Sequence, residues 1–291
     1  MSYKLFIGDY SYSSWSLRGW LLFRRFGIEA DIHRIDFSTD AAWSALAPHA
    51  PARTVPTLVT EDGVIWDSLA IAEELADRHP EAGLWPTDPG LRAMARSLAA
   101  EMHSGFTTLR SDCPMNTRTA YGEVPISDAL RADLDRVEML WSHALSRSGG
   151  PWLAGTYSVA DAFFAPVAAR IAGYGLPVGD TAQAYVDRHL DDGAFRRFRA
   201  MGFACGETLQ RYAKPYPTRD WPGPRPRDAR PVETGTPVNT TCPYSGEPVT
   251  HLMELDGTIY GFCNAFCRDK TVADPEAWPA FVDLMQTGGK G

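Results

Sequence analysis

The sequence lacks any uninterrupted apolar stretch of about 18 residues, and no positively charged start precedes an apolar run. We therefore expect neither a transmembrane helix nor a secretory leader, and we expect a cytoplasmic protein. The five cysteines in 291 residues are few and odd in number, which argues against a disulfide framework. Basic residues are outnumbered, with 28 Lys and Arg against 36 Asp and Glu and a net charge of −8. This balance argues against nucleic acid and anionic membranes as partners.

What remains is the composition of an ordinary folded protein. Hydrophobic residues make up 44% of the chain and charged residues 22%, which is enough for a real core. The length predicts about two domains, and no internal repeat is visible. Changes of pattern divide the chain into four segments: 1–82, 89–212, 213–237 and 238–291.

Residues 1–82 alternate between short apolar strands and helices. A strand–helix–strand unit is followed by a hairpin, with Asp62-Gly63 at its turn, and by a second helix that stops at His79-Pro80. The expected elements are a strand over 4–7, a helix over 17–26, strands over 31–35, 57–60 and 64–66, and a helix over 69–78. This βαβ–ββα order predicts a thioredoxin-like α/β domain.

Three features of this domain favour a binding site for glutathione. Val55-Pro56 follows the second strand, and a cis proline turns the backbone so that an extended peptide can pair with it. Asp67-Ser68 begins a helix, whose free N–H groups and positive dipole end suit the γ-glutamyl carboxylate. Ser13, Ser14 and Ser16 precede another helix, where a hydroxyl and the helix dipole help a thiol to ionise.

Residues 89–212 show helical rather than strand periodicity. Apolar residues recur at steps of three and four over 91–109 and 126–145. Ser158 and Asp161 have the spacing of a capping box before the apolar run 162–172. We predict an all-helical domain here, followed by a proline-rich, semi-rigid linker over 213–237.

The motifs of the first 212 residues resemble those of the glutathione S-transferase family. The resemblance rests on Ser11–Arg18, on Thr54-Val55-Pro56, on Trp66–Ile71 and on the capped segment Gly155–Asp161. The run Ser13-Ser14-Trp15-Ser16-Leu17-Arg18 is most similar to the serine-type, zeta-like group, whose motif has a cysteine where this chain has Trp15. The resemblance implies a transferase, generally dimeric, with isomerase activity also open, and Trp15 excludes cysteine-dependent chemistry at that position.

The resemblance also implies a role for individual residues. Ser13 would steady the glutathione thiolate, with Ser14 as the second candidate. The glutathione-binding set would be Val55, the cis proline Pro56, Asp67, Ser68 and Arg53, although Thr54 stands where the family often has a lysine. The expected pocket for a hydrophobic electrophile contains Trp15, His103, Phe106 and Arg110.

Structural roles compete with these functional ones. Ser13, Ser14 and Ser68 are also good helix caps, and a cis proline supports the fold with or without a ligand. His103, Phe106 and Arg110 lie at three- and four-residue steps that equally suit a helix-packing face. Trp141 and Trp152 are expected in the core.

The last segment, 238–291, holds three of the five cysteines. Cys242, Cys263 and Cys267 follow a Cys-x20-Cys-x3-Cys spacing, with a tight turn at the first and one helical turn between the other two. A hairpin over 252–262 would bring the three thiols together, in an arrangement that suits zinc or another soft ion. The segment is similar to TRASH and YHS-type treble-clef modules, small α+β folds that bind metal. His251 is the first candidate for a fourth ligand, Asp269 the second, and an external ligand or a metal-free knot of core cysteines is the alternative.

Three hypotheses follow. The first is an enzyme that activates glutathione for attack on an electrophile and carries an appended metal module. The second is a non-catalytic protein that uses the same fold for binding. The third is a glutathione-dependent protein that handles a soft metal ion.

Overall fold

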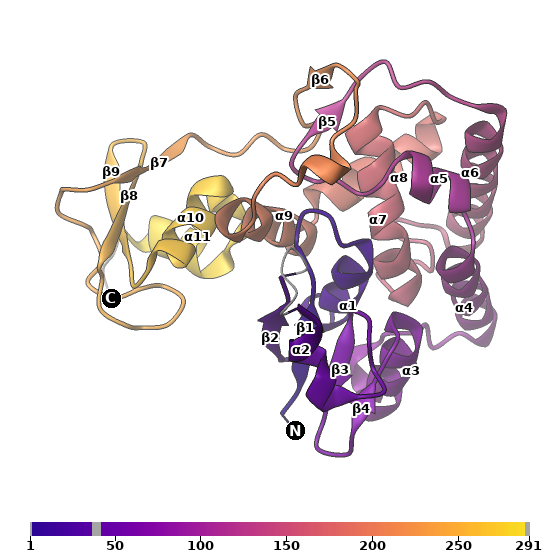
Figure 1. Ribbon diagram of the computed structural model, residues 1–291, viewed down its shortest axis with the longest axis horizontal. Coiled ribbons are helices and arrows are strands. Elements are labelled where there is room, and N and C mark those ends of the chain that lie inside the picture. Colours follow the sequence, from indigo (N-terminus) through magenta and orange to yellow (C-terminus); the bar gives the residue numbers. More distant parts are fainter. Residues whose placement is uncertain (1, 37–41, 289–291) are drawn as a thin grey trace. The chain divides into compact units, whose positions relative to one another are not determined.

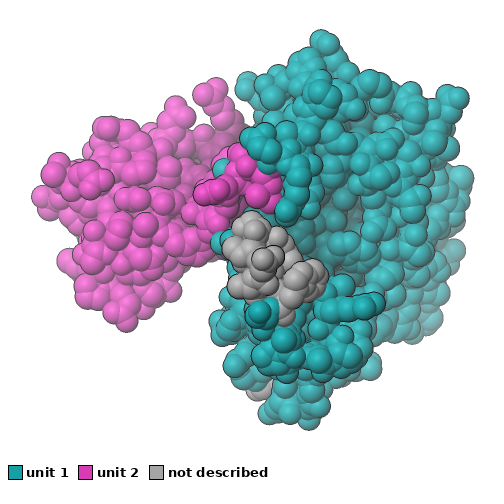
Figure 2. Space-filling model, viewed as in Figure 1, with its two compact units in different colours: residues 1–190, 210–222 teal, residues 191–209, 223–291 magenta. Residues whose placement is uncertain are grey.

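The computed structural model describes residues 2–36 and 42–288, and the chain forms two compact units (Figures 1 and 2). Unit 1 comprises residues 1–190 and 210–222, and unit 2 comprises residues 191–209 and 223–291. The chain therefore crosses from one unit to the other after residues 190, 209 and 222. Residues 191–209, which we assigned to the helical domain, group instead with the cysteine-containing segment.

The first half of unit 1 has the predicted thioredoxin-like arrangement. Its sheet has the order β2-β1-β3-β4, in which β1 and β2 are parallel and the other pairs are antiparallel. The elements are β1 (Lys4–Ile7), α1 (Ser14–Arg24), β2 (Asp31–Arg34), α2 (Ala42–Leu46), η1 (Ala47–His49), β3 (Thr57–Val59), β4 (Val64–Ile65), α3 (Ser68–Arg78) and η2 (Pro80–Ala82). The helix that we expected over 17–26 begins earlier, at Ser14, because Ser13 caps it.

A close approach joins α1 to the loop before β3. A Cβ atom added to Gly19 would lie 2.7 Å from Cβ of Pro56, which is closer than real side chains pack. Because glycine has no side chain, α1 packs directly on the proline ring. Glycine at position 19 therefore allows α1 to pack closely against the Val55–Pro56 peptide.

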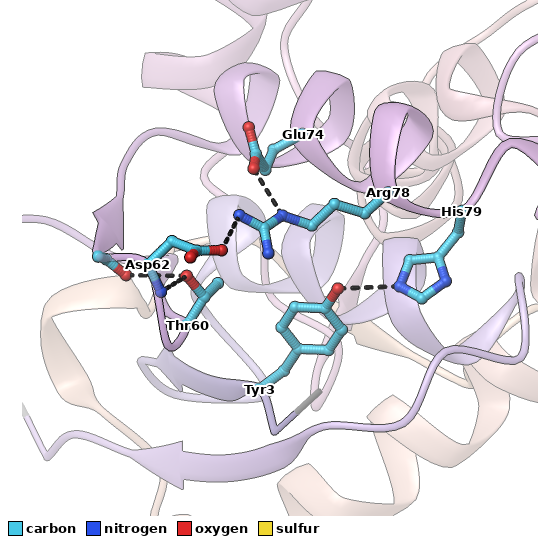
Figure 3. Close-up of polar contacts among 7 residues, drawn as sticks. Tyr3, Thr60, Asp62, Glu74, Arg78 and His79 are labelled. Atoms are coloured by element: carbon cyan, nitrogen blue, oxygen red, sulfur yellow. Dashed lines mark hydrogen bonds and ion pairs between the residues drawn. The ribbon is translucent and has the colours of Figure 1, made fainter.

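A polar network fastens the C-terminal end of α3 to the β3–β4 hairpin (Figure 3). The Arg78 guanidinium lies 2.6 Å from Glu74 and 2.9 Å from Asp62 of the hairpin. The next residue, His79, is hydrogen-bonded through Nε2 to the Tyr3 hydroxyl at 2.9 Å. Asp62 is mostly exposed, so its ion pair with Arg78 contributes little stability. These contacts connect the C-terminal end of α3 to the hairpin and to β1 through Tyr3.

The second half of unit 1 is helical, as predicted. Its helices are α4 (Pro89–Ser104), α5 (Thr107–Asp112), α6 (Asp128–Ser148), α7 (Val159–Tyr174) and α8 (Asp180–Asp191). Helix α7 carries the predicted capping box of Ser158 and Asp161. Trp141 is fully buried, as expected of a core residue.

One helix prediction was wrong. The helix expected over 91–109 ends at Ser104, and a separate short helix, α5, follows. Gly105 ends α4 because its backbone is extended, with ψ of −168°, and Phe106 then has a left-handed backbone with φ of 57°. A Cβ atom added to Gly105 would lie 2.8 Å from the Glu101 carbonyl oxygen, so glycine suits this position. Phe106 and Arg110 therefore do not share a helix face with His103.

The proline-rich segment contains two short strands. In unit 1, η3 (Gln210–Tyr212) leads to β6 (Thr218–Arg219), which pairs with β5 (Ala120–Tyr121). In unit 2, β7 (Ala229–Val232) pairs with β8 (His251–Leu255), which pairs with β9 (Thr258–Phe262). The hairpin expected over 252–262 is thus present.

The helices of unit 2 are α9 (Gly193–Cys205), α10 (Ala265–Ala273), η4 (Pro275–Ala277) and α11 (Pro279–Thr287). Among them, α10 packs on all three strands of this sheet, and α9 packs on α10. Arg196 of α9 forms two hydrogen bonds, of 2.9 and 2.7 Å, with the buried Asp274 that ends α10. Helix α9 is therefore part of the fold of the cysteine-containing unit. Within the described residues, no helix is both long and apolar enough to cross a bilayer.

Candidate functional site

The predicted catalytic serine, Ser13, lies at the N-terminus of α1. Its Oγ accepts a hydrogen bond from the Ser16 amide at 3.3 Å and lies 2.7 Å from the Ser16 hydroxyl. Ser16 Oγ in turn accepts a hydrogen bond from the Gly8 amide at 2.8 Å. The Asp9 carboxylate accepts hydrogen bonds from the amides of residues 11 and 12 in the same loop. Ser13 is thus a true helix cap, and it is half-buried rather than sealed. Either hydroxyl can donate in the Ser13–Ser16 hydrogen bond, and the Ser13 proton is available to a ligand when Ser16 is the donor.

Ser14, the second candidate for the catalytic hydroxyl, is buried and contacts Arg170. Its Oγ is 3.4 Å from a guanidinium nitrogen of Arg170 in α7. Arg170 is itself fully committed, since its other nitrogens donate to the carbonyls of Cys113 and Pro166. Of the two serines, Ser13 has the geometry of an available donor.

The Val55–Pro56 peptide bond is cis, as the resemblance implies. Val55 is half-buried and packs against the cluster of Phe6, Ile35 and Leu46, while Pro56 is buried beneath α1. Arg53 is exposed two residues earlier. The loop over residues 53–56 therefore has an exposed start at Arg53 and a packed end at Val55 and Pro56.

Asp67 and Ser68 form the start of α3. Asp67 caps the helix by accepting from the Leu69 amide at 3.0 Å, and its other carboxylate oxygen lies 3.1 Å from Nε2 of His103 in α4. Ser68 is fully buried, and its Oγ has no hydrogen-bond partner among the described residues. An unsatisfied hydroxyl at a helix start is a ready donor or acceptor for a ligand.

Trp15 is the centre of the predicted second-substrate pocket. Its ring meets the His103 ring edge-on at 5.1 Å, so His103 links the start of α1 to Asp67 at the start of α3. The guanidinium carbons of Arg18 and Arg110 lie 4.4 and 5.0 Å from the centre of the Trp15 ring. The structure thus brings three of the four predicted pocket residues together. Phe106, the fourth, is buried and faces Phe164 instead.

The charge around Trp15 is the least expected property of this site. Arg18 is 1% exposed, and its Nε and one terminal nitrogen have no hydrogen-bond partner among the described residues. Burial lowers the pKa of Arg18, and the positive charges of Arg170 and Arg110 lower it further. The pKa of Arg170 is lowered in the same way, by burial and by Arg110. Three guanidinium groups therefore share one neighbourhood in which Asp67 is the carboxylate that favours the charged form of Arg18.

Sequence reasoning missed the roles of Arg18 and Arg170. Arg170 stands alone in the otherwise apolar run of α7, and a lone charge in such a run is itself a signal, because buried arginines are rare. Arg18 is four residues after Ser14 and therefore on the same face of α1.

A second candidate site lies in unit 2, where Cys242, Cys263 and Cys267 come together. Their sulfur atoms all lie within 4.8 Å of one another, and those of Cys263 and Cys267 are 3.9 Å apart. Ser245 Oγ and Asn264 Nδ2 each lie 3.3 Å from the Cys263 sulfur. The spacing read from the sequence thus predicted the grouping.

Two of the thiols differ in acidity. Burial raises the pKa of Cys242, but backbone amides of residues 263, 244 and 245 outweigh it and lower that pKa to about 7. Burial raises the pKa of Cys267 to about 12, with Lys270 opposing and the neighbouring cysteines reinforcing the shift. A cation is what would let all three ionise together.

The predicted fourth ligand, His251, does not join the three thiols. Its Nδ1 is 2.9 Å from the Thr250 hydroxyl, and the residue lines a separate hollow of about 580 Å³ with Glu233 and Arg268. Asp269 is paired with Arg268 at 2.7 Å. In the described parts of the chain, the group consists of three cysteines alone.

Comparison with known proteins identifies the fold of unit 1. Residues 12–78 match the family model for the N-terminal domain of glutathione S-transferase. A probable maleylacetoacetate isomerase from Caenorhabditis elegans is 36% identical over 98 residues, which are 34% of this chain and 45% of that protein. The chain thus matches about half the length of this relative.

Solved structures extend the likeness to the helical region. A glutathione transferase homolog from Burkholderia gl BGR1, with bound glutathione, is 21% identical with a TM-score of 0.54, over 69% of this chain and 98% of that one. One from Methylococcus capsulatus is 24% identical with a TM-score of 0.52, over 69% and 98%. A Bombyx mori glutathione S-transferase, unclassified 2, is 23% identical with a TM-score of 0.53, over 65% and 88%. About two thirds of the chain therefore has a glutathione-transferase fold, and residues 12–78 match the N-terminal domain model of that family.

Proposed function

We propose that this chain is a glutathione transferase in which Ser13 activates the thiol of glutathione for attack on an electrophile that carries a carboxylate. One observation carries the proposal: His103 contacts both Trp15 and Asp67, so the helix starts that would activate the thiol and bind the γ-glutamyl group are held as one site. The family match of residues 12–78 and the neighbour with bound glutathione support it.

In this proposal each end of glutathione has its own partners. The γ-glutamyl carboxylate accepts from the free amides and the Ser68 hydroxyl at the start of α3, and its ammonium group faces Asp67. The cysteine unit pairs with the backbone of Val55. Arg53, exposed nearby, is the candidate for the glycine carboxylate.

The chemical step needs only groups on this chain and the two substrates. Ser13 Oγ–H donates to the glutathione sulfur, which releases its proton to solvent and becomes a thiolate stabilised by the start of α1. The thiolate then forms a carbon–sulfur bond. With an organic halide, the carbon–halogen bond breaks and its electron pair leaves with the halide ion. With a double bond conjugated to a carbonyl, the π electrons move to the carbonyl oxygen as an enolate, which then takes a proton from solvent.

The charge around Trp15 supports a negatively charged electrophile. We expected a hydrophobic molecule, but the buried and partly unpartnered Arg18, beside Arg110 and Arg170, favours one that bears a negative charge. The name of the Caenorhabditis elegans relative, an isomerase of maleylacetoacetate, agrees with an acid anion as substrate. Isomerisation would use the same thiolate, adding to a double bond and leaving again after rotation.

Matched electrophiles test the proposal. We would titrate reduced glutathione into the wild type and Ser13→Ala by calorimetry, and then compare turnover of 2-chloropropionate and 2-chloropropionamide, each relative to its uncatalysed rate. We expect binding by both proteins, turnover by the wild type alone, and a larger acceleration for the charged substrate. No binding at millimolar glutathione would leave a non-catalytic fold, and an equal acceleration would refute the anionic substrate.

A second function is favoured by the three thiols of unit 2. We propose that Cys242, Cys263 and Cys267 hold a zinc ion or another thiophilic cation, since three sulfurs within 4.8 Å match three corners of a tetrahedron. Bound zinc would supply folding stability. The backbone amides that lower the pKa of Cys242 favour its thiolate form, which is the form that binds a cation. Metal analysis of purified protein tests this, and a metal-free protein that unfolds identically with and without zinc would leave the cysteines as core residues.

The family resemblance further leads us to propose a homodimer. Sedimentation at micromolar protein distinguishes it from a monomer.

A further inference from the structure

The loop that carries Ser13 is held by a segment from the far end of unit 1. Residues 210–222, which we call the strap, return to unit 1 after α9. The ring of Tyr212 stacks on the ring of Tyr12, with centres 4.6 Å apart and planes inclined by 20°. Tyr12 is buried and immediately precedes Ser13, so the strap contacts the residue next to the proposed catalytic hydroxyl.

The strap itself is firmly anchored. β6 pairs with β5, and the Gly122 amide donates to the Pro217 carbonyl at 2.8 Å. Arg219 donates to the carbonyls of Tyr121 and Ala172, the second of which belongs to α7. The Lys214 amide donates to the Tyr121 hydroxyl at 3.3 Å, two residues after Tyr212. Tyr212 is therefore presented by a fixed support.

The opposite side of the loop is anchored by the helical region. The Ser11 carbonyl accepts from the Thr117 amide at 3.1 Å. Asp9 accepts from the amides of Ser11 and Tyr12, and the Ser13 amide donates to the Asp9 carbonyl at 3.0 Å. These bonds hold the backbone of the loop, and the stacking of Tyr212 on Tyr12 adds a side-chain contact to it.

We infer that Tyr212 is a positioning residue for Ser13. By stacking on Tyr12 it holds the loop backbone in the conformation that aims the Ser13 hydroxyl at the site of the glutathione sulfur. This inference rests on the proposed function for its catalytic consequence, but the position of the loop can be measured without glutathione. The stacked pair is typical of aromatic contacts whose loss changes a local equilibrium by roughly 2- to 10-fold.

The experiment compares Tyr212→Ala with Tyr212→Phe, which keeps the ring. Tyr216→Ala is the matched control, because Tyr216 lies on the same strap but its ring packs against Tyr121 and not against Tyr12. Hydrogen exchange of the amides of residues 11–16 in free protein reports the loop. We expect exchange roughly 2- to 10-fold faster in Tyr212→Ala and unchanged in the other two variants.

With glutathione, the pH dependence of thiolate absorbance and of kcat/KM reports the aim of Ser13. Tyr212→Ala should raise the pKa of the bound thiol and lower kcat/KM roughly 2- to 10-fold at neutral pH, while affinity for S-methylglutathione stays within about twofold. A wild-type pH profile and wild-type exchange in Tyr212→Ala, or an equal effect of Tyr216→Ala, would overturn the inference. Failure of the wild type to bind glutathione would overturn the proposed function, and the exchange result would still decide the role of Tyr212.

Discussion

Replacing Arg18 with methionine should make the protein more stable while weakening its hold on a carboxylate. Arg18 is 1% exposed and carries two buried nitrogens without partners, next to Arg170 and Arg110. A buried charge without a hydrogen-bonded carboxylate costs several kcal/mol, whereas the contacts of Arg18 with the rings of Trp15 and Phe163 return about 1–2 kcal/mol each. Methionine keeps the apolar stem and a favourable sulfur–aromatic contact. We therefore expect Arg18→Met to raise the free energy of unfolding by about 1 kcal/mol.

The binding effect has the opposite sign. A hydrogen bond to a charged group contributes about 1.5–3 kcal/mol, which corresponds to roughly a 10- to 150-fold difference in affinity. The probe pair is S-carboxymethylglutathione and S-ethylglutathione, which differ in the charge of the group on sulfur. The wild type should prefer the carboxymethyl compound, and Arg18→Met should lose at least about tenfold of that preference.

Urea unfolding and calorimetric titration measure the two effects separately. Arg24→Met is the matched control, because Arg24 lies on the same helix but forms an exposed pair with Glu29 at 3.2 Å. It should change stability by less than about 0.5 kcal/mol and leave the preference unchanged. If Arg18→Met destabilises the protein and retains the wild-type preference, Arg18 is a structural residue and the electrophile is not an anion.

Three further predictions concern other parts of the chain. His189 is buried among aromatic rings, and burial together with Arg25 and Arg188 lowers its pKa to about 3. As the pH falls below 6.5, His189 therefore binds a proton in the unfolded state but not in the folded state. The free energy of unfolding decreases as the pH is lowered from 6.5 toward 3. Between pH 7 and 5, His189→Leu should lose about 2 kcal/mol less than the wild type in urea unfolding, and parallel losses would contradict this reasoning. Asp274→Asn should destabilise unit 2 by about 3 kcal/mol, because it breaks the buried ion pair with Arg196. Hydrogen exchange should then be faster in both α9 and α10. Faster exchange in α10 alone would show that α9 folds independently. Removal of zinc by a chelator should lower the melting temperature of the wild type and not that of Cys267→Ser, and an equal shift in both would exclude the three thiols as the site.

Local sequence signals predicted most of the secondary structure because they act over a few residues. Ser13, Asp67 and Ser158 cap the helices they precede, and Asp62-Gly63 and Asp256-Gly257 form the turns of their hairpins. The exception, the break after Ser104, depends on the extended backbone of Gly105 and the left-handed backbone of Phe106. Helical periodicity continues through that point, so it could not reveal the break.

The spacing of the cysteines likewise predicted a group that forms within 26 residues of chain, since a hairpin and one helical turn suffice to close it. The fourth ligand was not predictable in this way. His251 lies at the start of β8, where it pairs with Phe262 of β9, and its Nδ1 lies beside the Thr250 hydroxyl. Its position therefore depends on the pairing of these two strands.

By itself, therefore, the sequence determined the thioredoxin-like order of strands, the serine and aspartate at two helix starts, and the three neighbouring thiols. Tertiary structure alone decided which unit α9 joins, which tyrosine covers the Ser13 loop and which arginines surround Trp15. The contacts that made these decisions join residues far apart in the chain, such as Ser14 with Arg170 and Arg196 with Asp274. A periodic pattern predicts which face of a helix is apolar, but the element that packs against that face is determined only by the fold of the whole chain.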